Sequence, residues 1–332
     1  MSTPTSSLLR PRVLAPGDVV AVAGLSNSLG EHDRAGLDRG VAVLAEMGFE
    51  VRVAPLVDPR RRRWWAAGTP QEQADELNAL LRDPQVRAIV PHTGGNSVFA
   101  YLDLIDFDAV VADPKIVLGY SDISLLLLAL HARTGLVGLH GDGVTHGLGG
   151  DWFVRAVEGQ RAQLTDLYTR VLTRAEPLGA LPAARPWECW RPGQASGPLV
   201  GGLISRLQRI QATPYALAPE CFDGAILFWE DVGRPLHWVW NDLHALRLAG
   251  VLDRIAGMLV GVPHDLQAVN GDSPPELREV VLDVLGDRRL PVLGQVEFGH
   301  AGPNLPLPLG VRAELDAEAR TVALVEAAFA PG

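Results

Sequence analysis

Short apolar segments alternate with helical patterns along the first 140 residues, and this repetition constrains the fold more than any other feature of the sequence. The expected strands cover residues 19–23, 49–53, 88–90, 115–118 and 136–140, and a helical pattern follows each of the first four. Parallel neighbouring strands need such crossovers, so the pattern predicts an α/β domain with a parallel sheet and helices on both faces. Ligands of such sheets bind at the carboxyl ends of the strands.

The stretch 115–130, KIVLGYSDISLLLLAL, joins an expected strand to an expected helix through a short polar turn. A strand that turns sharply into a helix exposes the side chain of the turn residue, close to the positive end of the helix dipole. Ser121 is therefore a candidate nucleophile, although Ile123 stands where the second glycine of a G-x-S-x-G motif would be. The alternative is that Ser121 or Asp122 only caps the helix.

A double glycine, Gly94-Gly95, follows the expected strand at 88–90, within the segment HTGGNS. Its backbone N–H groups can approach an oxyanion or a carboxylate closely, because no Cβ atoms stand in the way. The alternative is a tight strand-to-helix turn that binds no ligand. Like Ser121, this turn falls at the carboxyl end of an expected strand, so we expect both at the same edge of the sheet.

The length of 332 residues suggests two domains, or one domain with a large insert. The expected parts are an N-terminal nucleophile domain at 1–150, an interdomain connection at 151–196 and a C-terminal domain at 197–332. Two tryptophans, Trp187 and Trp190, stand out in the connection, where the periodic pattern weakens. Near the end of the chain, residues 311–315 and 322–325 alternate about a polar turn, which predicts a hairpin.

The composition argues against several classes of protein. The formal net charge of -10 disfavours general binding of nucleic acid, although a local basic patch is compatible with it. The two cysteines fit neither a disulfide framework nor a thiolate metal site, and they suit a reducing compartment. The N-terminus has no apolar signal-peptide core, and no apolar run approaches the ~20 residues that span a bilayer. We therefore expect a cytoplasmic protein that binds neither membranes nor nucleic acid.

A nucleophilic serine needs a base within hydrogen-bond reach, and the base needs an acid to orient it. Glu230 and His300 are the candidates, since each closes an expected strand and enters a loop, where catalytic groups usually project. The alternatives are a surface carboxylate and an ordinary turn histidine. A metal site at His140, Asp142 and His146 is a further alternative, but that spacing matches no familiar site, so we expect no metal.

Four consecutive arginines, Arg60 to Arg63, precede Trp64 and Trp65. Guanidinium groups beside indoles can hold a phosphate or a nucleobase. The alternative, more common in proteins, is a solvated loop whose tryptophans fold back on the body of the domain.

Several segments together resemble those of the LD-carboxypeptidase family of serine peptidases, which includes the microcin C immunity peptidases. They occur in the family's order and run through most of the chain. The segments are Trp65 to Thr69 (WAAGT), the turn at Gly94-Gly95, Gly119 to Ser124 (GYSDIS), Gly197 to Gly202 (GPLVGG), Leu227 to Asp231 (LFWED) and Phe298 to Gly310 (FGHAGPNLPLPLG).

The resemblance implies a Ser-His-Glu triad, with Ser121 as nucleophile, His300 as general base and acid, and Glu230 as the group that orients the imidazole. It also implies an oxyanion hole built from the backbone N–H groups of Gly95 and Asp122. The implied fold has a flavodoxin-like N-terminal domain and a smaller C-terminal domain of mixed strands, which carries the Glu and the His. The implied protein is a cytoplasmic homodimer that needs no metal or cofactor.

This sequence departs from the family pattern at two places that bear on the choice of substrate. The usual Gly-Gly-Asn-Leu is here Gly201-Gly202-Leu203-Ile204, and the double glycine continues with Asn96-Ser97, which is closer to the microcin-immunity branch. In that branch tryptophans can stack on a nucleobase, so we expect Gly94, Asn96, Ser97, Trp187 and Trp190 to bind substrate. The alternative for the indoles is that both only pack the connection.

We therefore expect a hydrolase that cleaves a C-terminal amide of a peptide, a muropeptide or a peptidyl-nucleotide through an acyl-enzyme. The alternative is a protein that keeps the fold and binds a small molecule or peptide without turnover.

Overall fold

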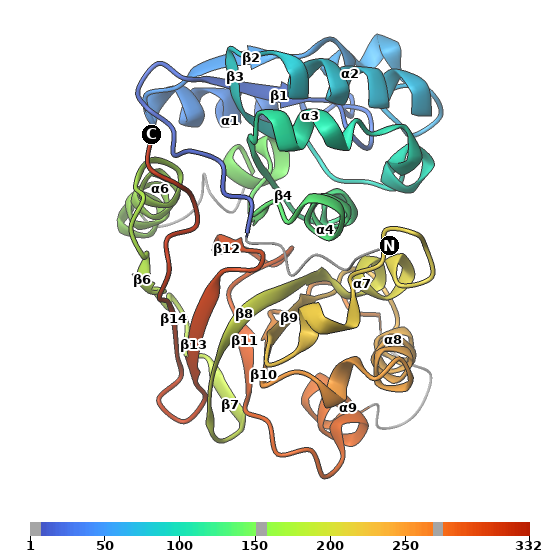
Figure 1. Cartoon of the computed structure of the whole chain (residues 1–332), viewed down its shortest axis with the longest axis vertical. Helices are drawn as coiled ribbons and strands as arrows, with labels where there is room; N and C mark the ends of the chain where they lie inside the picture. Colours follow the sequence, from blue (N-terminus) through green and yellow to red (C-terminus); the bar gives the residue numbers. More distant parts are fainter. Residues whose placement is uncertain (1–7, 151–157, 268–274) are drawn as a thin grey trace. The chain divides into compact units, whose positions relative to one another are not determined.

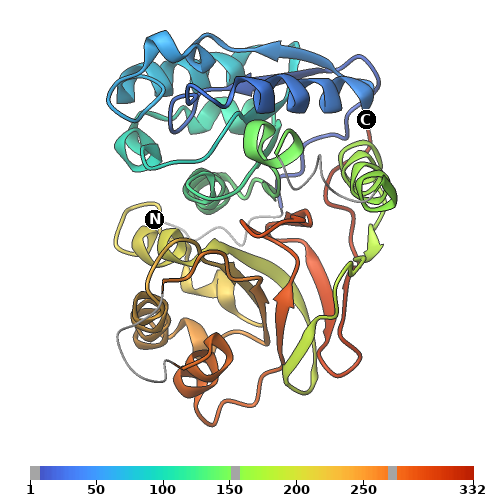
Figure 2. The same ribbon diagram turned by 180° about the vertical axis from the view of Figure 1, so that it is seen from behind.

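Alternating strands and helices build the first of two units in the computed structural model (Figure 1). The structure describes residues 8–150, 158–267 and 275–332. Unit 1 contains the chain up to Glu176, Pro306–Leu309 and Ala327–Gly332, whereas unit 2 contains Pro177–Leu305 and Gly310–Glu326. Within the described part of the expected connection, residues 158–176 lie in unit 1 and residues 177–196 lie in unit 2. Each unit has a sheet of its own, which Figure 2 shows from behind.

The sheet of unit 1 has the strand order β12-β5-β4-β3-β1-β2. The strands are β1 (Val19–Ala23), β2 (Glu50–Val53), β3 (Val86–Pro91), β4 (Ile116–Gly119), β5 (Leu139–His140) and β12 (Leu307–Pro308). All neighbours are parallel except β12, which pairs antiparallel with β5. The order β2-β1-β3-β4-β5 is the flavodoxin-like order, so the expected α/β fold is confirmed.

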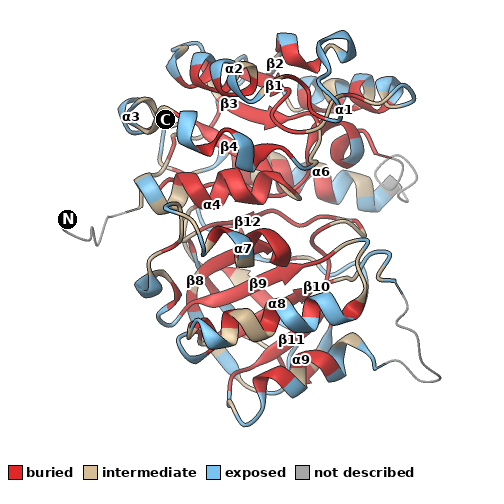
Figure 3. Cartoon of the chain, turned by 90° about the vertical axis from the view of Figure 1, so that its right-hand side faces the viewer, coloured by how far each residue is buried: buried red, intermediate tan, exposed pale blue. Residues whose placement is uncertain are grey.

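Helices cover both faces of this sheet, as Figure 3 shows. They are α1 (Arg34–Glu46), α2 (Pro70–Arg82), α3 (Phe107–Ala112), α4 (Ile123–Thr134) and α6 (Glu158–Thr173). Short 3₁₀ helices occupy Pro55–Val57, Pro59–Arg61, Val98–Ala100 and Leu102–Leu104, and Val144–Leu148 forms a π-helical turn. The helix α2 starts at a capping box, in which the Thr69 side chain accepts the N–H of Glu72 and the Glu72 carboxylate accepts the N–H of Thr69.

Unit 2 contains a mixed sheet with the order β6-β14-β13-β8-β9-β10-β11-β7. The strands are β6 (Gly179–Ala180), β7 (Glu188–Arg191), β8 (Gln194–Leu203), β9 (Ile226–Glu230), β10 (Gly257–Gly261), β11 (Val292–Val296), β13 (Arg312–Asp316) and β14 (Thr321–Leu324). Strands β8 to β11 are parallel, and the others join antiparallel. The pair β13 and β14 confirms the expected hairpin.

The parallel strands of unit 2 are connected through the helices α7 (Ile204–Ile210), α8 (Leu236–Leu248) and α9 (Leu277–Leu285). Short 3₁₀ helices at Pro219–Phe222 and Val251–Asp253 complete these crossovers. In the described ranges of both units, no helix is long and apolar enough to cross a membrane.

Candidate active site

Ser121 occupies the turn between β4 and α4 in a strained backbone conformation. Its φ is 61°, in the left-handed region that a residue with a side chain seldom adopts. The helix begins at Ile123, and Asp122 at its N-cap makes no side-chain cap bond to it. The turn is therefore the sharp strand-to-helix type that the sequence predicts, and helix capping does not account for Asp122.

The double glycine lies against Ser121 within the same unit. A Cβ atom added at Gly94 would stand 2.7 Å from the Ser121 Cβ and 2.9 Å from its Oγ. The two predicted site elements are therefore brought together at the carboxyl ends of β3 and β4. Backbone N–H groups that face a reacting centre can stabilise a developing oxyanion.

Asn27, which the sequence analysis did not single out, holds both ends of the glycine turn. Its backbone N–H donates to the carbonyl of Gly94 at 3.1 Å. Its side-chain Oδ1 accepts the N–H of Asn96 at 3.2 Å. Its position in the sequence could have indicated this role, because Asn27 lies in the polar loop after the first expected strand, at the sheet edge where ligands bind.

Of the two residues after the glycine pair, Asn96 is exposed and Ser97 is buried. The carbonyl of Asn96 accepts a bond from the indole Nε1 of Trp65 at 3.3 Å. The N–H of Ser97 donates to the Asp122 carboxylate at 2.8 Å. The backbone that follows the double glycine is therefore held by Trp65 at Asn96 and by Asp122 at Ser97.

His92 supports the same loop from the end of β3. Burial lowers the pKa of its imidazole to about 4, so the ring is neutral near pH 7. Its Nε2 lies 3.0 Å from the carbonyl oxygen of Asn27, so we assign the ring proton to that nitrogen. A neutral His92 thus donates to the residue that holds the glycine turn.

We expect His92 to make the fold sensitive to acid. A histidine whose pKa is lowered on folding contributes stability that is present above its unfolded pKa of 6.5 and is lost as the pH falls towards 4. Between pH 7 and 4.5, urea unfolding should show wild type losing about 2 to 3 kcal/mol more than His92→Gln, which retains a donor but cannot titrate. Equal losses in the two proteins would contradict this role.

Glu230 and His300 form a hydrogen-bonded pair within unit 2. Glu230 ends β9, and His300 follows β11 in the loop that starts at Glu297. The Nδ1 of His300 lies 2.7 Å from Oε2 of Glu230; the carboxylate is 0% exposed and the imidazole 16%. A buried carboxylate that accepts the Nδ1 proton favours the tautomer in which Nε2 carries the lone pair of a base.

The loop that carries His300 is shaped around the Glu230 side chain. A Cβ atom added at Gly299 would stand 2.6 Å from Cγ of Glu230, so the carboxylate stem passes directly over this glycine. The N–H of Gly299 donates to Oδ1 of the buried Asn304 at 2.8 Å. These contacts fix the imidazole and the carboxylate in one orientation.

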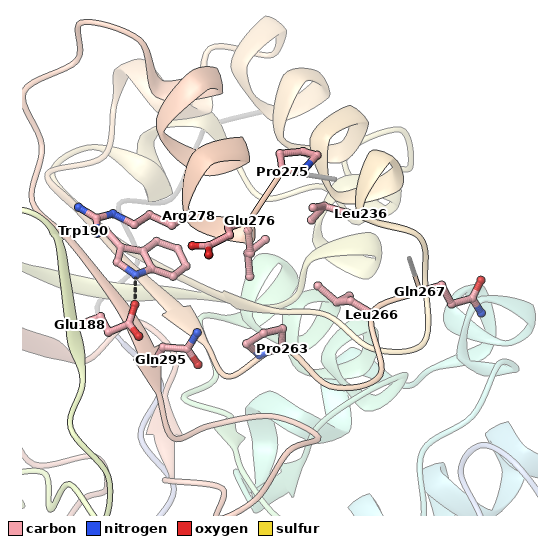
Figure 4. Close-up of a pocket in the computed structure, with 11 residues that line it drawn as sticks. Glu188, Trp190, Leu236, Pro263, Leu266, Gln267, Pro275, Glu276, Arg278 and Gln295 are labelled. Atoms are coloured by element: carbon pink, nitrogen blue, oxygen red, sulfur yellow. Dashed lines mark hydrogen bonds between the residues drawn. The ribbon is translucent and has the colours of Figure 1, made fainter. Parts of the chain in front are cut away.

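Trp187 and Trp190 are both buried in unit 2, with 2% and 4% exposure. The indole of Trp190 rests on Gly294, where an added Cβ would stand 2.1 Å from the ring, and its Nε1 donates to Oε2 of Glu188 at 2.7 Å. Trp190 also lines a pocket of about 530 Å³, which Figure 4 shows, and Trp187 does not. The pocket is lined by Glu188, Trp190, Leu236, Pro263, Leu266, Gln267, Pro275, Glu276, Leu277, Arg278 and Gln295.

The arginine run lies at the surface of unit 1. All four arginines are exposed; Arg60 pairs with Asp58, and the guanidinium of Arg63 stacks 4.3 Å from the ring centroid of Trp64. Trp64 and Trp65 are 70% and 55% exposed. This arrangement agrees with the solvated loop, although both indoles stay more than half exposed, and that of Trp65 reaches the body of the unit through its hydrogen bond to the carbonyl of Asn96.

The metal alternative finds no support in the described residues. Across residues 8–150, 158–267 and 275–332, no group of three or more histidine, cysteine, aspartate or glutamate side chains is placed to hold a metal ion. His140 and Asp142 are buried, whereas the side chain of His146 is half exposed and faces Asp33 at 3.5 Å.

Comparison with known proteins finds family matches in both parts of the chain. The family model of the LD-carboxypeptidase N-terminal domain matches residues 20–141, and that of the LD-carboxypeptidase C-terminal domain matches residues 196–315. The probable murein peptide carboxypeptidase of Bacillus subtilis is 30% identical, over 97% of this chain and 96% of the relative. The microcin C7 self-immunity protein MccF of Escherichia coli is 28% identical, over 87% of each.

A solved structure of MccF in complex with glutamyl sulfamoyl guanosine is also similar. It has a TM-score of 0.84 and 25% sequence identity, covering 97% of this chain and 100% of that chain.

Proposed function

The chain belongs to the LD-carboxypeptidase family, and on that premise we propose that Ser121, His300 and Glu230 act as a triad that cleaves a C-terminal amide. The observation that carries the proposal is the pairing of His300 with the buried Glu230 at 2.7 Å. The strained Ser121 beside the double glycine supports the role of nucleophile. That the chain is a hydrolase agrees with its carboxypeptidase-named relatives.

In the proposed reaction the Ser121 Oγ attacks the carbonyl carbon of the scissile amide while Nε2 of His300 takes the hydroxyl proton. The N–H groups of Gly95 and Asp122 hold the developing oxyanion, an effect commonly worth about 10²–10³ in rate for each donor. His300 then gives its proton to the leaving amine, and the acyl group stays on Ser121. Water attacks this ester with His300 as base, and the serine is released.

For the substrate we propose an aminoacyl- or peptidyl-nucleotide rather than a muropeptide. The support is the Asn96-Ser97 continuation of the double glycine, together with the likeness to MccF, whose solved complex contains glutamyl sulfamoyl guanosine. The pocket lined by Trp190 offers an indole edge beside polar side chains such as Gln295 and Arg278. A likeness to the murein peptide carboxypeptidase keeps the muropeptide as the second candidate.

A hydrolysis panel tests this function directly. Purified protein is incubated with a glutamyl sulfamoyl nucleotide and with a muropeptide that ends in an L,D-amide, and free amino acid is measured by mass spectrometry. We expect turnover of the nucleotide substrate by wild type and none by Ser121→Ala. Tight binding of either compound without turnover, and no labelling of Ser121 by a fluorophosphonate, would indicate the binding protein instead.

Trp190→Ala should separate the two substrate classes. If the indole contacts the nucleobase, its removal should lower kcat/KM for the nucleotide substrate roughly tenfold, since stacking on one base is worth ~1–3 kcal/mol. Cleavage of a muropeptide, which has no base, should change little. The matched control is Trp187→Ala, because that indole is equally buried but lines no part of the pocket.

Steady-state kinetics of both variants, after their thermal stability has been checked, decides between base recognition and packing. Equal losses on both substrates would mean that the indoles only pack the sheet, whereas a loss confined to the nucleotide substrate would mean base recognition.

A further inference from the structure

We propose that the side chain of Asp122 is a positioning group for the reaction: its carboxylate holds the Ser121 turn against the segment that carries the double glycine. The inference rests on the proposed function of Ser121 and adds a residue whose side chain acts through others. In the proposed reaction the Asp122 carboxylate itself takes no part in bond formation or proton transfer.

One carboxylate oxygen of Asp122 joins two separate loops. Its Oδ2 accepts bonds from the hydroxyl of Ser26 at 2.7 Å, from the N–H of Ser97 at 2.8 Å and from the N–H of Val98 at 3.1 Å. The first donor lies 96 residues away in the sequence, and the other two lie 25 and 24 residues away. The loop after β1 and the loop after β3 are therefore both tied to the residue that follows Ser121.

The side chain of Asp122 is buried, so its hydrogen bonds must compensate for the water that it has lost. Asp122 is only 1% exposed, and a carboxylate is costly to bury unless hydrogen bonds compensate for the lost water. An aspartate at a helix start usually caps its own helix, but this side chain makes no cap bond to α4. Its hydrogen bonds go instead to neighbouring loops, and bonds to an ionised acceptor are roughly twice as strong as neutral ones.

The hydrogen bonds of Asp122 to Ser97 and Val98 lie close in sequence to both proposed oxyanion donors. Its own N–H is one proposed oxyanion donor, and the N–H of Gly95, two residues before Ser97, is the other. The side chain thus ties the residue that carries one donor to Ser97, two residues after the residue that carries the other. Both donors must stay within a few tenths of an ångström of their productive places. Loss of the carboxylate should move the donors and lower kcat, while substrate binding elsewhere is retained.

A purely structural brace is the competing explanation, and Glu76 supplies a matched control for it. Its carboxylate also accepts two backbone N–H groups within unit 1, from Gly24 at 2.8 Å and from Leu56 at 2.7 Å. Neither partner belongs to the double-glycine segment or to the turn at Ser121. Glu76→Ala should therefore cost stability without a selective effect on kcat.

The experiment compares Asp122→Ala, Asp122→Asn and Glu76→Ala by steady-state kinetics on the better substrate of the panel and by amide hydrogen exchange. For Asp122→Ala we expect kcat to fall by about 10²-fold, KM to change less than about threefold, and residues 94–98 to exchange faster. Asp122→Asn retains an acceptor oxygen, so it should keep most of the wild-type kcat and most of the slow exchange of residues 94–98. Glu76→Ala should change neither kcat nor the exchange of 94–98.

A folded Asp122→Ala protein with wild-type kcat, or with unchanged exchange at 94–98, would overturn the proposal. So would equal losses of kcat in Asp122→Ala and Glu76→Ala. If Asp122→Ala does not fold, Asp122→Asn decides. A small fall in kcat together with slightly faster exchange of 94–98 supports positioning, whereas wild-type values of both, or a change in one alone, refute it. If wild type hydrolyses neither substrate, the proposed function fails, while the exchange data still show whether Asp122 orders the loop.

Discussion

Ser121→Ala and His300→Ala are each expected to lower kcat by more than about 10³-fold while leaving the fold intact. Nucleophile and base act as one unit, so removing either one disables the same step. Glu230→Ala should lose somewhat less, because the carboxylate only orients the imidazole and stabilises its charged form. The double variant of Ser121 and His300 should be hardly slower than either single variant.

Single-turnover hydrolysis with circular dichroism on each variant checks this expectation. His237→Ala is the control for general loss of a histidine, since His237 is exposed on α8 in the same unit as His300. A folded Ser121→Ala protein with near-normal hydrolysis would remove Ser121 from the mechanism. Full activity of Glu230→Ala would mean that another acid orients His300.

The strand and helix around Ser121 could be predicted because their signals are local. Residues 116–118 are apolar and run up to a glycine, and β4 ends at Gly119. The apolar run after the turn becomes α4. A sharp turn between them follows from chain geometry alone, and φ of 61° at Ser121 agrees with it. Likewise, Glu230 ends β9 as the pattern predicted.

Two of the elements that the sequence analysis missed were missed for different reasons. The helix α6 falls where the pattern was described as weak, although its buried residues keep a helical spacing: Leu164, Leu167, Tyr168, Val171 and Leu172. That signal was present in the sequence. The strand β8 was not recognised because Gly and Pro, which have low strand propensity, occupy several of its positions. Its parallel and antiparallel neighbours supply the stability that local preference does not.

The contacts that support the site could not be predicted, because they join residues distant in sequence. Asn27 bonds to a turn that lies 69 residues later, and the carboxylate of Asp122 reaches back to Ser26. No spacing rule relates such positions without a fold. The burial of Trp190 depends in the same way on the bare backbone of Gly294, which only strand pairing brings beneath the indole.

Gly94→Ala should lower kcat by at least about 10²-fold through a clash that the structure locates. The new Cβ would stand 2.7 Å from the Ser121 Cβ and 2.9 Å from its Oγ, distances that real Cβ atoms essentially never show. Either the serine or the turn with its oxyanion donors must therefore move. A shift of 1 Å at such a site can cost about 10²-fold in rate.

Gly30→Ala provides the comparison for this clash. The atoms nearest to an added Cβ there belong to the carboxylate group of Asp33, a side chain that can rotate away, so we expect wild-type kcat. Kinetics and the rate of fluorophosphonate labelling of Ser121 are measured on both variants after a stability check. Slow hydrolysis and slow labelling in Gly94→Ala would place the reacting oxygen beside the double glycine. Wild-type rates in a folded Gly94→Ala protein would mean that the turn lies elsewhere during the reaction, and the assignment of Gly95 as an oxyanion donor would then be wrong.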